Sequence, residues 1–391
     1  MSPTPVTFAT PTAPTAYTWE ATDAEVAARY GVPIERVVRF DLNTSPAPPG
    51  LAARVLAAGR FDPPISEYPP SDYERLIAAA AARYGVDASE LIVGAGADEV
   101  LDVIGKACLP TGAVAVIPTP TYAMYRVLSE QRAARVIRVP RLPASDGWAI
   151  DLPAVREAAR EAAVVWLCSP NNPTALAEPT GSVERLLDGL ASDARSAGRP
   201  PPVVVLDEAY AEFAGASLHG LRTGYPELIV VRTASKAYAL AGLRVGFGIA
   251  DPALIARLLP YRPPASVSTV SATVVADVLG AASIAADNVA RISAERARLR
   301  EALSGLGWSV GDSVTNFFLV DFGLPARAAM VAERFLTVGL VPRTFPADHP
   351  LASYLRLTVR NETEDDRLLD VARDIGEAGR IDEPLPGDGG T

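Results

Sequence analysis

Seven short apolar runs alternate with amphipathic segments between residues 91 and 250, and this alternation limits the fold more than any other feature. Most of the runs are continuous and rich in Val and Ile, as expected of strands buried on both faces. The runs are residues 91–95, 113–118, 134–139, 163–169, 202–209, 228–235 and 245–250. The helical patterns between them are residues 98–108, 121–131, 152–162 and 182–198. This order predicts an α/β domain with a mostly parallel sheet and helices on both faces.

The chain changes character after about residue 264. Residues 269–306 have the pattern of one or two long helices, and the strands and helices after them are shorter. We therefore expect a second, smaller α+β domain. The expected divisions are a loose N-terminal arm (1–16), a segment joining the small domain (17–45), a large domain (46–280), the small C-terminal domain (281–379) and a disordered tail (380–391).

Composition excludes several classes of function. The net charge of −10 argues against a nucleic acid or an anionic membrane as partner. The two cysteines, Cys108 and Cys168, follow no paired pattern, which is typical of a reducing compartment. The two histidines are far apart in the sequence, so we expect no metal site. We find no signal peptide and no apolar run of membrane-spanning length, and we expect a cytoplasmic protein.

The chain has 34 arginines but only two lysines, Lys106 and Lys236. Arginine stays protonated, whereas a desolvated lysine can lose its proton and act as a base or form a Schiff base. Lys236 lies among small and apolar residues and is therefore a candidate for covalent chemistry. The alternative is that both lysines have no special role and simply remain in a chain whose codon bias favours arginine over lysine. That explanation suits Lys106, which ends a helical pattern where a cation is favourable.

Polar residues of unusual type follow several of the expected strands, where ligands collect in open α/β sheets. Asp207 ends one strand, although a helix cap or an internal salt bridge would also explain it. Asn172 follows another strand in a Pro-Asn-Asn-Pro sequence, which alone reads as a turn. Small residues at 96–98 begin a helix and can hold a phosphate. A dinucleotide site at residues 92–100 is disfavoured, because Glu99 replaces the third glycine.

Ser235 and Arg244 flank Lys236 and suit a phosphate dianion. A lysine, a phosphate cup and a carboxylate at neighbouring strand ends together match pyridoxal 5'-phosphate (PLP). That cofactor needs an amine for its aldehyde, donors for its phosphate and a carboxylate at its ring nitrogen. The sequence therefore predicts a PLP site.

The segment TASKAYALAGLRVGF (233–247) closely resembles the lysine segment of fold-type I PLP-dependent aminotransferases, above all the histidinol-phosphate aminotransferase branch. The likeness continues in family order through EYPPSDYERL, VGAGADE, PTPTYAMYR, CSPNNPT, VVLDEAYAEF and YLRLTV, and covers roughly residues 17–378. Seven motifs in order make this signal specific. The resemblance implies the class I/II aminotransferase fold, with a large PLP-binding domain, and an enzyme that transfers amino groups.

The resemblance also implies roles for single residues around the cofactor. Lys236 would bind the aldehyde and serve as the base, and Asp207 would keep the ring nitrogen protonated. Asn172 and Tyr210 would bind the ring hydroxyl, and Tyr122 would stack on the ring. The residues that would bind the phosphate are Ala97, Asp98, Thr233, Ser235 and Arg244, together with Tyr68 of a neighbouring subunit. This last role implies a homodimer with shared active sites.

Four residues would meet the substrate. Arg356 would pair with the substrate carboxylate, with Asn43 nearby. Arg343 matches a position near the distal end of the substrate, and Tyr17 an aromatic position near the N-terminus. The expected substrates are an amino acid or amine and a 2-oxo acid.

Several positions depart from the family pattern. Ala175 replaces a glycine after Asn-Pro-Thr, and Arg360 replaces another after the Arg356 strand. Trp19 and Glu20 place bulk and a negative charge where a substrate phosphate would approach. We therefore keep three readings. The first is an aminotransferase of the histidinol-phosphate type. The second is a related PLP enzyme for an aromatic or other amino acid or a specialised-metabolism intermediate, including decarboxylation. The third is a non-catalytic PLP-binding protein.

Overall fold

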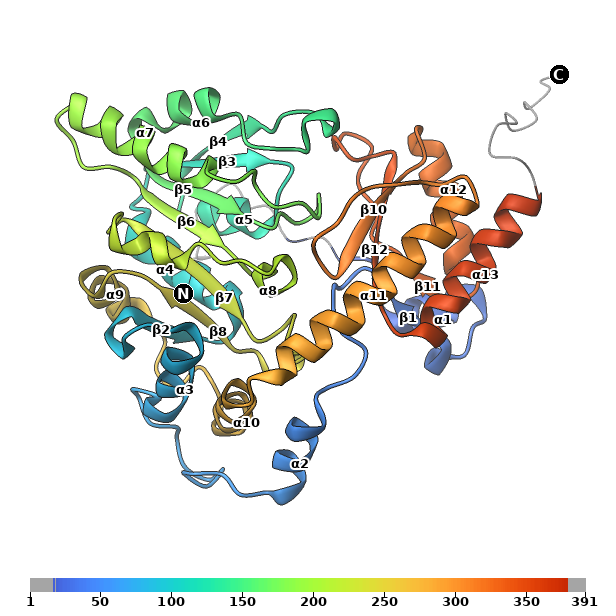
Figure 1. The fold of residues 1–391 in the computed structure, drawn as a ribbon, viewed down its shortest axis with the longest axis horizontal. Coiled ribbons are helices and arrows are strands. Elements are labelled where there is room, and N and C mark those ends of the chain that lie inside the picture. Colours follow the sequence, from blue (N-terminus) through green and yellow to red (C-terminus); the bar gives the residue numbers. More distant parts are fainter. Residues whose placement is uncertain (1–16, 18, 379–391) are drawn as a thin grey trace, which may run out of the picture.

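Residue 17 and residues 19–378 are described in a computed structural model of the protein. The expected N-terminal arm and the expected disordered tail lie outside the described residues. The described chain forms two lobes, a larger one around a seven-stranded sheet and a smaller one that contains the C-terminal strands and helices (Figure 1).

The central sheet of the larger lobe is mostly parallel, as predicted. Only β8 runs antiparallel to its two neighbours. In spatial order the strands are β2 (Leu91–Gly94), β8 (Gly246–Ile249), β7 (Leu228–Thr233), β6 (Val203–Asp207), β5 (Ala162–Cys168), β3 (Val114–Thr119) and β4 (Arg135–Pro140). Every apolar run expected to be a strand contributes one, and the α/β prediction is confirmed.

Helices cover both faces of this sheet, which explains why its strands are apolar throughout. Along β5, Val164 and Trp166 pack on one face while Val165 and Leu167 pack on the other. The helices on the first face are α4 (Gly96–Cys108), α5 (Met124–Gln131) and α9 (Pro252–Leu258). Those on the second are α3 (Glu74–Tyr84), α6 (Leu152–Ala158), α7 (Ser182–Ser196), α8 (Ala211–Ala214) and α10 (Thr269–Gly280). Helix α6 ends earlier than expected, in a 3₁₀ turn at Ala159–Glu161.

The smaller lobe combines two short sheets with four helices. One sheet pairs β1 (Val38–Arg39) with β11 (Leu340–Val341) in parallel, so the N-terminal segment joins the C-terminal lobe. The other orders β12 (Tyr354–Thr358), β10 (Phe317–Asp321) and β9 (Ser309–Val310) as antiparallel neighbours. The helices are α1 (Asp23–Tyr30), α11 (Ser283–Gly305), α12 (Pro325–Leu336) and α13 (Glu362–Ala378). The exact domain divisions stay a prediction.

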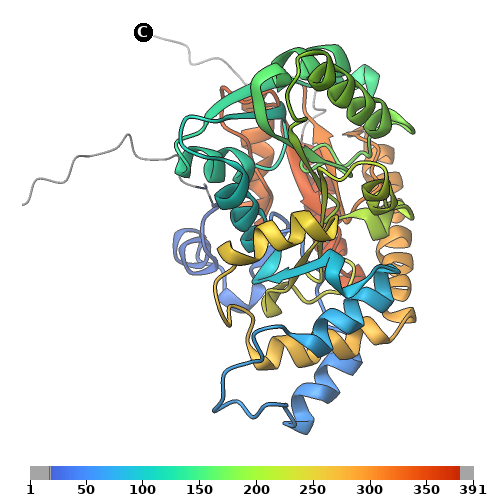
Figure 2. The same cartoon turned by 90° about the vertical axis from the view of Figure 1, so that its left-hand side faces the viewer.

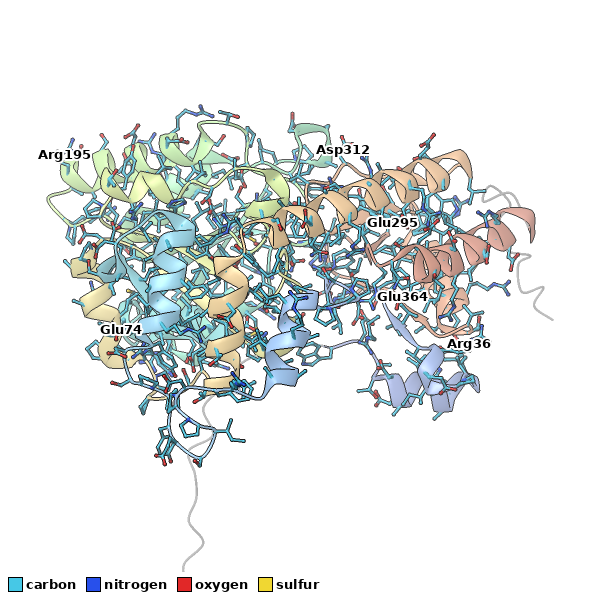
Figure 3. The ribbon with its side chains drawn as sticks, turned by 60° about the horizontal axis from the view of Figure 1, so that its bottom comes forward. Arg36, Glu74, Arg195, Glu295, Asp312 and Glu364 are labelled. Atoms are coloured by element: carbon cyan, nitrogen blue, oxygen red, sulfur yellow. The ribbon has the colours of Figure 1, made fainter. Side chains whose placement is uncertain are left out.

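Helices α10 and α11 connect the lobes. Helix α2 (Gly50–Ala58) and α3 both pack on α10, and α11 then runs from α10 into the smaller lobe (Figures 1 and 2). There α11, with Glu295, lies beside α13, with Glu364 (Figure 3). None of the described helices is by itself long and apolar enough to cross a membrane. The pair α10 and α11, bent by 81°, meets such a test only by combined length and composition.

Candidate active site

A pocket of about 500 Å³ lies at the carboxyl ends of β5, β6 and β7, where residues of the smaller lobe also reach it. All the residues expected at the site line this pocket except Tyr68 and Arg343. Those that line it are Tyr17, Asn43, Ala97, Asp98, Tyr122, Asn172, Asp207, Tyr210, Thr233, Ser235, Lys236, Arg244 and Arg356. The fold thus brings together residues more than 300 positions apart, while their individual roles stay predictions.

Lys236 is placed by the turn that follows β7. Its Nζ donates to the backbone oxygen of Asn43 at 3.1 Å and lies 5.7 Å from the centre of the Tyr210 ring. Burial, and then the nearby charge of Arg356, lower the pKa of this amine to about 8. Lys106 instead lies on α4 and pairs with Asp102 at 2.6 Å, one helical turn away. Only Lys236 has the surroundings of a reactive amine.

Asp207 ends β6 and is buried, and both of its oxygens accept hydrogen bonds. The backbone N–H of Ala209 donates to Oδ1 at 3.0 Å, and the hydroxyl of Tyr125 donates to Oδ2 at 2.7 Å. Burial raises the pKa of the Asp207 carboxyl to about 6. The sequence analysis did not anticipate Tyr125. Its spacing of three residues from Tyr122, within a segment expected to be helical, was the available signal, although the helix begins only at Met124.

The N-terminus of α4 and the segment around Lys236 form a cup of hydrogen-bond donors. Ala97 and Asp98 at the start of α4 line the pocket together with Thr233, Ser235 and Arg244. Gly96, with φ +82°, lets Arg244 approach the helix, because a Cβ there would collide with the guanidinium. Arg244 contacts the Asp98 carboxylate at 3.1 Å. Backbone amides, hydroxyls and an arginine are the donor set that a phosphate dianion needs.

Arg356 on β12 brings a buried guanidinium from the smaller lobe into the pocket. Its Nη1 donates to Asn172 Oδ1 at 2.5 Å, and its Nη2 donates to the backbone oxygen of Asp41. Its Nε finds no partner among the described residues. Asn43, in turn, donates from Nδ2 to the Tyr210 hydroxyl at 3.0 Å. The pocket therefore holds a cation in a suitable place for a carboxylate.

Asp41, Leu42 and Thr44 also line the pocket and were not anticipated by the sequence analysis. They are neighbours of Asn43 in the sequence, so the expected place of Asn43 at the substrate could have predicted that they line the pocket. Arg360, at a position where the family has glycine, holds this segment: its Nη1 donates to the hydroxyl of Thr44 at 3.1 Å.

Two aromatic residues border the outer part of the pocket. Tyr17 packs edge-on against Trp19, with ring centres 4.8 Å apart, and also against Tyr122 at 6.3 Å. Trp19 lines the pocket but keeps 69% of its surface exposed. The guanidinium of Arg343 lies over the Tyr17 ring at 5.8 Å, outside the pocket wall. An aromatic rim thus separates Arg343 from the inner pocket.

Glu20 contacts Arg343 and is not among the residues that line the pocket. Its Oε1 accepts hydrogen bonds from the backbone N–H of Thr344 at 2.8 Å and from the Thr344 hydroxyl at 2.9 Å. The same oxygen lies 3.8 Å from Arg343 Nη1. The charge of Glu20 therefore acts on Arg343, which itself pairs through its backbone with Arg356.

Two other positions named by the sequence analysis lie apart from the pocket. Ala175 has φ +66° and is fully buried, so the backbone keeps the left-handed form that usually favours glycine. Tyr68 lies between α2 and α3 with 88% of its surface exposed. Its expected role needs a second subunit and stays a prediction.

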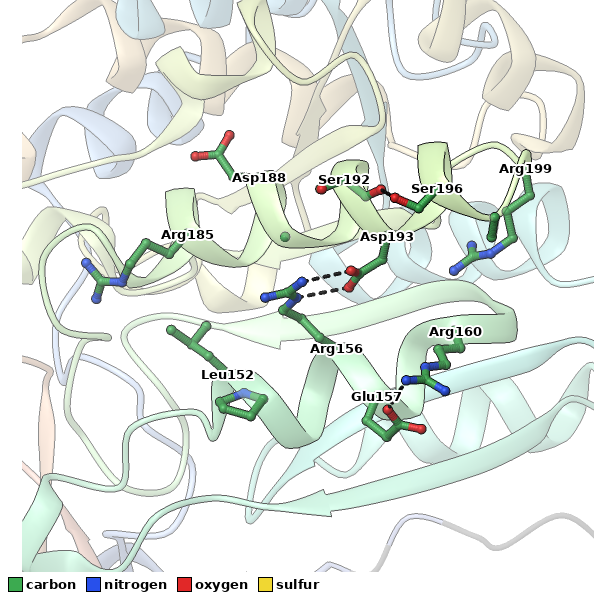
Figure 4. Close-up of a pocket in the computed structure, with 13 residues that line it drawn as sticks. Leu152, Arg156, Glu157, Arg160, Arg185, Asp188, Ser192, Asp193, Ser196 and Arg199 are labelled. Carbon is green, nitrogen blue, oxygen red and sulfur yellow. Dashed lines mark hydrogen bonds and ion pairs between the residues drawn. The ribbon is translucent and has the colours of Figure 1, made fainter.

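A larger groove of about 1040 Å³ lies between α6 and α7 (Figure 4). Its charged residues mostly neutralise one another. Arg156 forms two hydrogen bonds with Asp193, and Arg160 pairs with Glu157 at 2.7 Å (Figure 4). Among the described residues, no group of three or more His, Cys, Asp or Glu is arranged to hold a metal ion. The smaller pocket is therefore the candidate active site.

Comparison with known proteins identifies the family of the chain. The family model for aminotransferase class I and II matches residues 51–371. A histidinol-phosphate aminotransferase of Roseiflexus castenholzii is 36% identical over 364 residues, covering 90% of this chain and 92% of that protein. One of Xylella fastidiosa is 39% identical over 319 residues, covering 80% and 84%.

A solved histidinol-phosphate aminotransferase of Sinorhizobium meliloti, in complex with pyridoxal-5'-phosphate, superposes with a TM-score of 0.79. It is 22% identical, and 92% of this chain and 96% of that chain are covered. This structural likeness shows the fold, whereas the family model and the two relatives show the family. The chain therefore belongs to the class I and II aminotransferases, the family that its sequence motifs predict.

Proposed function

We propose that this enzyme is a PLP-dependent aminotransferase of the histidinol-phosphate type, which moves the amino group of histidinol phosphate to a 2-oxo acid. The observation that carries the proposal is the meeting of Lys236, Asp207 and Arg356 in one pocket. The relatives that are 36% and 39% identical bear the name histidinol-phosphate aminotransferase, which supports this substrate over others.

The residues of the pocket fit the cofactor. The partly buried Lys236 lines the same cavity as the donor cup at the N-terminus of α4 and the carboxylate of Asp207. When bound, PLP supplies an aldehyde that takes up the amino group and a ring that accepts the electrons released at the substrate carbon. Lys236, Asp207 and the cup would hold its aldehyde, ring nitrogen and phosphate respectively.

Lys236 is suited to move the proton during transfer. Its pKa is lowered to about 8, so at that pH about half of the amines are neutral and able to accept a proton from the substrate carbon. Asp207, with a pKa raised to about 6, is largely ionised above that pH and can hold a proton at the ring nitrogen. Asp207 is thus mainly ionised above about pH 6 and Lys236 mainly neutral above about pH 8, so both groups are in their working forms above about pH 8.

Arg356 would bind the carboxylate of the 2-oxo acid. Its planar guanidinium is buried, and its Nε is without a partner among the described residues, so a carboxylate would satisfy a donor that is otherwise unpaired. Asn172 Oδ1 accepts from Nη1 of the same guanidinium and holds it at the pocket.

A second candidate function is a related PLP enzyme for an aromatic or other uncharged amino acid. The observation that favours it is Glu20, which lies 3.8 Å from Arg343 and offsets the charge that a distal phosphate would meet. The aromatic rings of Tyr17 and Trp19 at the pocket rim suit an apolar side chain. A non-catalytic role is disfavoured, because Lys236, Asp207 and Arg356 are all retained.

We also infer a homodimer with shared active sites. Ile65 and Tyr68 are 73% and 88% exposed in the segment between α2 and α3, and a partner subunit that covers this segment would bury both. In that dimer Tyr68 would reach the phosphate site of the partner. A cytoplasmic location is supported by Cys108 and Cys168, both of which are free and buried.

Single-turnover experiments test the function. The PLP form of the enzyme is mixed with histidinol phosphate, and the pyridoxamine phosphate form with 2-oxoglutarate, while cofactor absorbance is followed. We expect rapid conversion in both half-reactions. Conversion with 2-oxoglutarate but not with histidinol phosphate would overturn the assigned amino donor, while the protein would still be an aminotransferase. An aromatic amino acid in the same assay tests the second candidate function.

A further inference from the structure

Tyr125 lies outside the pocket wall yet contacts the carboxylate that the proposed chemistry needs. Its side chain is fully buried on α5, and its hydroxyl donates to Asp207 Oδ2 at 2.7 Å. The other oxygen of Asp207 accepts from the backbone N–H of Ala209 at 3.0 Å. Both donors are neutral groups, so they hold the carboxylate in place without adding a positive charge beside it.

Two aromatic rings pack against the ring of Tyr125, and a hydrogen bond holds its backbone. The Tyr125 ring stacks on Trp166, with ring centres 5.6 Å apart and only 5° between the planes, and Tyr122 packs edge-on against it at 5.6 Å. Trp166 donates from Nε1 to the Ser129 hydroxyl at 3.0 Å, and that hydroxyl donates to the backbone oxygen of Tyr125 at 2.7 Å. The network closes on itself, so the Tyr125 hydroxyl has little freedom to leave Asp207.

This contact favours the ionised form of a carboxylate that burial makes costly. Burial raises the pKa of Asp207, and the hydrogen bonds from Tyr125 and Ala209 lower it again. The other titratable groups that face Asp207 are Lys236, Asp98, Cys168, Tyr122 and Tyr210. Within the described part of the chain, Tyr125 is the only residue whose side chain donates a hydrogen bond to the carboxylate of Asp207.

We propose that Tyr125 is a positioning residue, which orients Asp207 toward the ring nitrogen of the cofactor and keeps it ionised there. The inference rests on the proposed use of PLP and is independent of the amino donor. Tyr125 does not touch the reacting atoms. It acts through Asp207, and its removal is therefore expected to change cofactor binding in a pH-dependent way.

The test measures binding of pyridoxamine 5'-phosphate to the cofactor-free enzyme across pH 5 to 9, because this form cannot bond covalently to Lys236. Tyr125→Phe removes only the hydroxyl. We expect its affinity at pH 7 to fall about tenfold, the value of one hydrogen bond to a charged group. The pH at which affinity declines on acidification should rise by about one unit, because Asp207 then takes up its proton more readily.

Three controls separate positioning from a general loss of structure. Tyr84→Phe removes another buried hydroxyl, which has no hydrogen-bond partner among the described residues, and it should leave both values unchanged. We expect inorganic phosphate to bind the donor cup, and because it has no ring nitrogen, Tyr125→Phe should not alter its affinity. In an Asp207→Asn background, Tyr125→Phe should have little further effect on pyridoxamine phosphate binding.

The outcomes are distinguishable. An unchanged affinity and pH profile in Tyr125→Phe would overturn the positioning role, as would equal effects in the presence and absence of the Asp207 carboxylate. If Tyr125→Phe does not fold, Ser129→Ala replaces it as the test. This substitution removes the Ser129 hydroxyl that links Trp166 to the backbone of Tyr125, and it keeps the Tyr125 hydroxyl. It should shift the pH profile in the same direction by a smaller amount. Failure of the unmutated enzyme to bind pyridoxamine phosphate would instead reject the proposed function.

Discussion

Arg356 and Asn172, 184 residues apart in the chain, are joined by a 2.5 Å hydrogen bond from Nη1 to Oδ1. The bond links β12 of the smaller lobe to the loop after β5 of the larger lobe. It thereby fixes the distance between the end of the pocket expected to bind a carboxylate and the end expected to bind the cofactor ring. A change at Arg356 should therefore be felt at both ends.

Arg356→Lys is expected to raise the KM for 2-oxoglutarate by about one to two orders of magnitude. Lysine retains a charge but loses the planar pair of donors, and a hydrogen bond to a charged group contributes about 1.5–3 kcal/mol. Steady-state kinetics over a range of 2-oxo acid concentrations measures this change. Arg373→Lys, at an exposed ion pair with Asp370 on α13, is the matched control and should leave KM unaltered. A normal KM in Arg356→Lys would remove Arg356 from carboxylate binding.

Borohydride reduction of the PLP-loaded enzyme should attach the cofactor to Lys236. Its pKa is lowered to about 8 by burial and by Arg356, so its amine is available, whereas Lys106 is engaged by Asp102 on the surface of α4. Peptide mapping after reduction identifies the labelled lysine. Lys106→Arg should be labelled as fully as the unmutated protein, and Lys236→Arg should not be labelled. Label on Lys106 would contradict the assignment of the site.

Glu20→Gln is expected to lower the KM for histidinol phosphate about fivefold. A carboxylate about 4 Å from a guanidinium attracts it by about 1 kcal/mol in water, and removing that charge leaves Arg343 more positive toward a phosphate. The effect should shrink at high salt. Glu35→Gln, at an exposed position before β1, is the control. An increased KM would mean that Glu20 instead holds Arg343 in a productive position.

Ala133→Gly should stabilise the cofactor-free protein by about 1 kcal/mol. Ala133 is exposed just beyond α5 and has φ +53°, a conformation that costs an alanine about that much. Ala175→Gly, at φ +66°, should gain less because it also removes a buried methyl group worth about 0.8 kcal/mol. Urea unfolding measures both.

Ala197 is the control for these two substitutions. It is exposed at the end of α7 with φ −89°, so glycine there should destabilise the protein. A larger gain at Ala175 than at Ala133 would contradict the argument from backbone strain.

Asp365→Asn should stabilise the protein increasingly as pH rises. Asp365 is fully buried on α13, and burial together with Glu295 on α11 raises its pKa well above the ordinary 3.8. Because the pKa of Asp365 is higher in the folded than in the unfolded protein, the protonated carboxyl makes its full contribution to the stability of the fold below about pH 4. This contribution is then lost as pH rises toward the folded pKa. The amide cannot ionise and avoids this loss.

Urea unfolding at pH 5 and pH 8.5 measures the difference between the two proteins. Asp366→Asn is the control, since Asp366 is about half exposed and pairs with Arg298 at 2.8 Å. A difference between Asp365→Asn and the unmutated protein that is constant with pH would show that Asp365 ionises normally in the folded state.

Local sequence patterns determined the architecture of the larger lobe. The apolar runs became strands because residues such as Val164 and Val165 must both be buried, on opposite faces of one sheet. The same patterns placed Asp207 and Lys236 at strand ends, since parallel strands present their carboxyl ends at one edge. Lys236 also stood out by composition alone, as one of two lysines in the chain.

Only the tertiary structure decided which side chains meet across the lobes. The contact between Tyr125 and Asp207 depends on the way α5 packs on the sheet, and the direction of Glu20 depends on Thr344, which is 324 residues away. Such contacts are set by rotamers and by packing between distant elements, which no periodicity encodes. The sequence alone therefore determined which chemical groups the protein has at its strand ends, and the folded chain decided how each group is held.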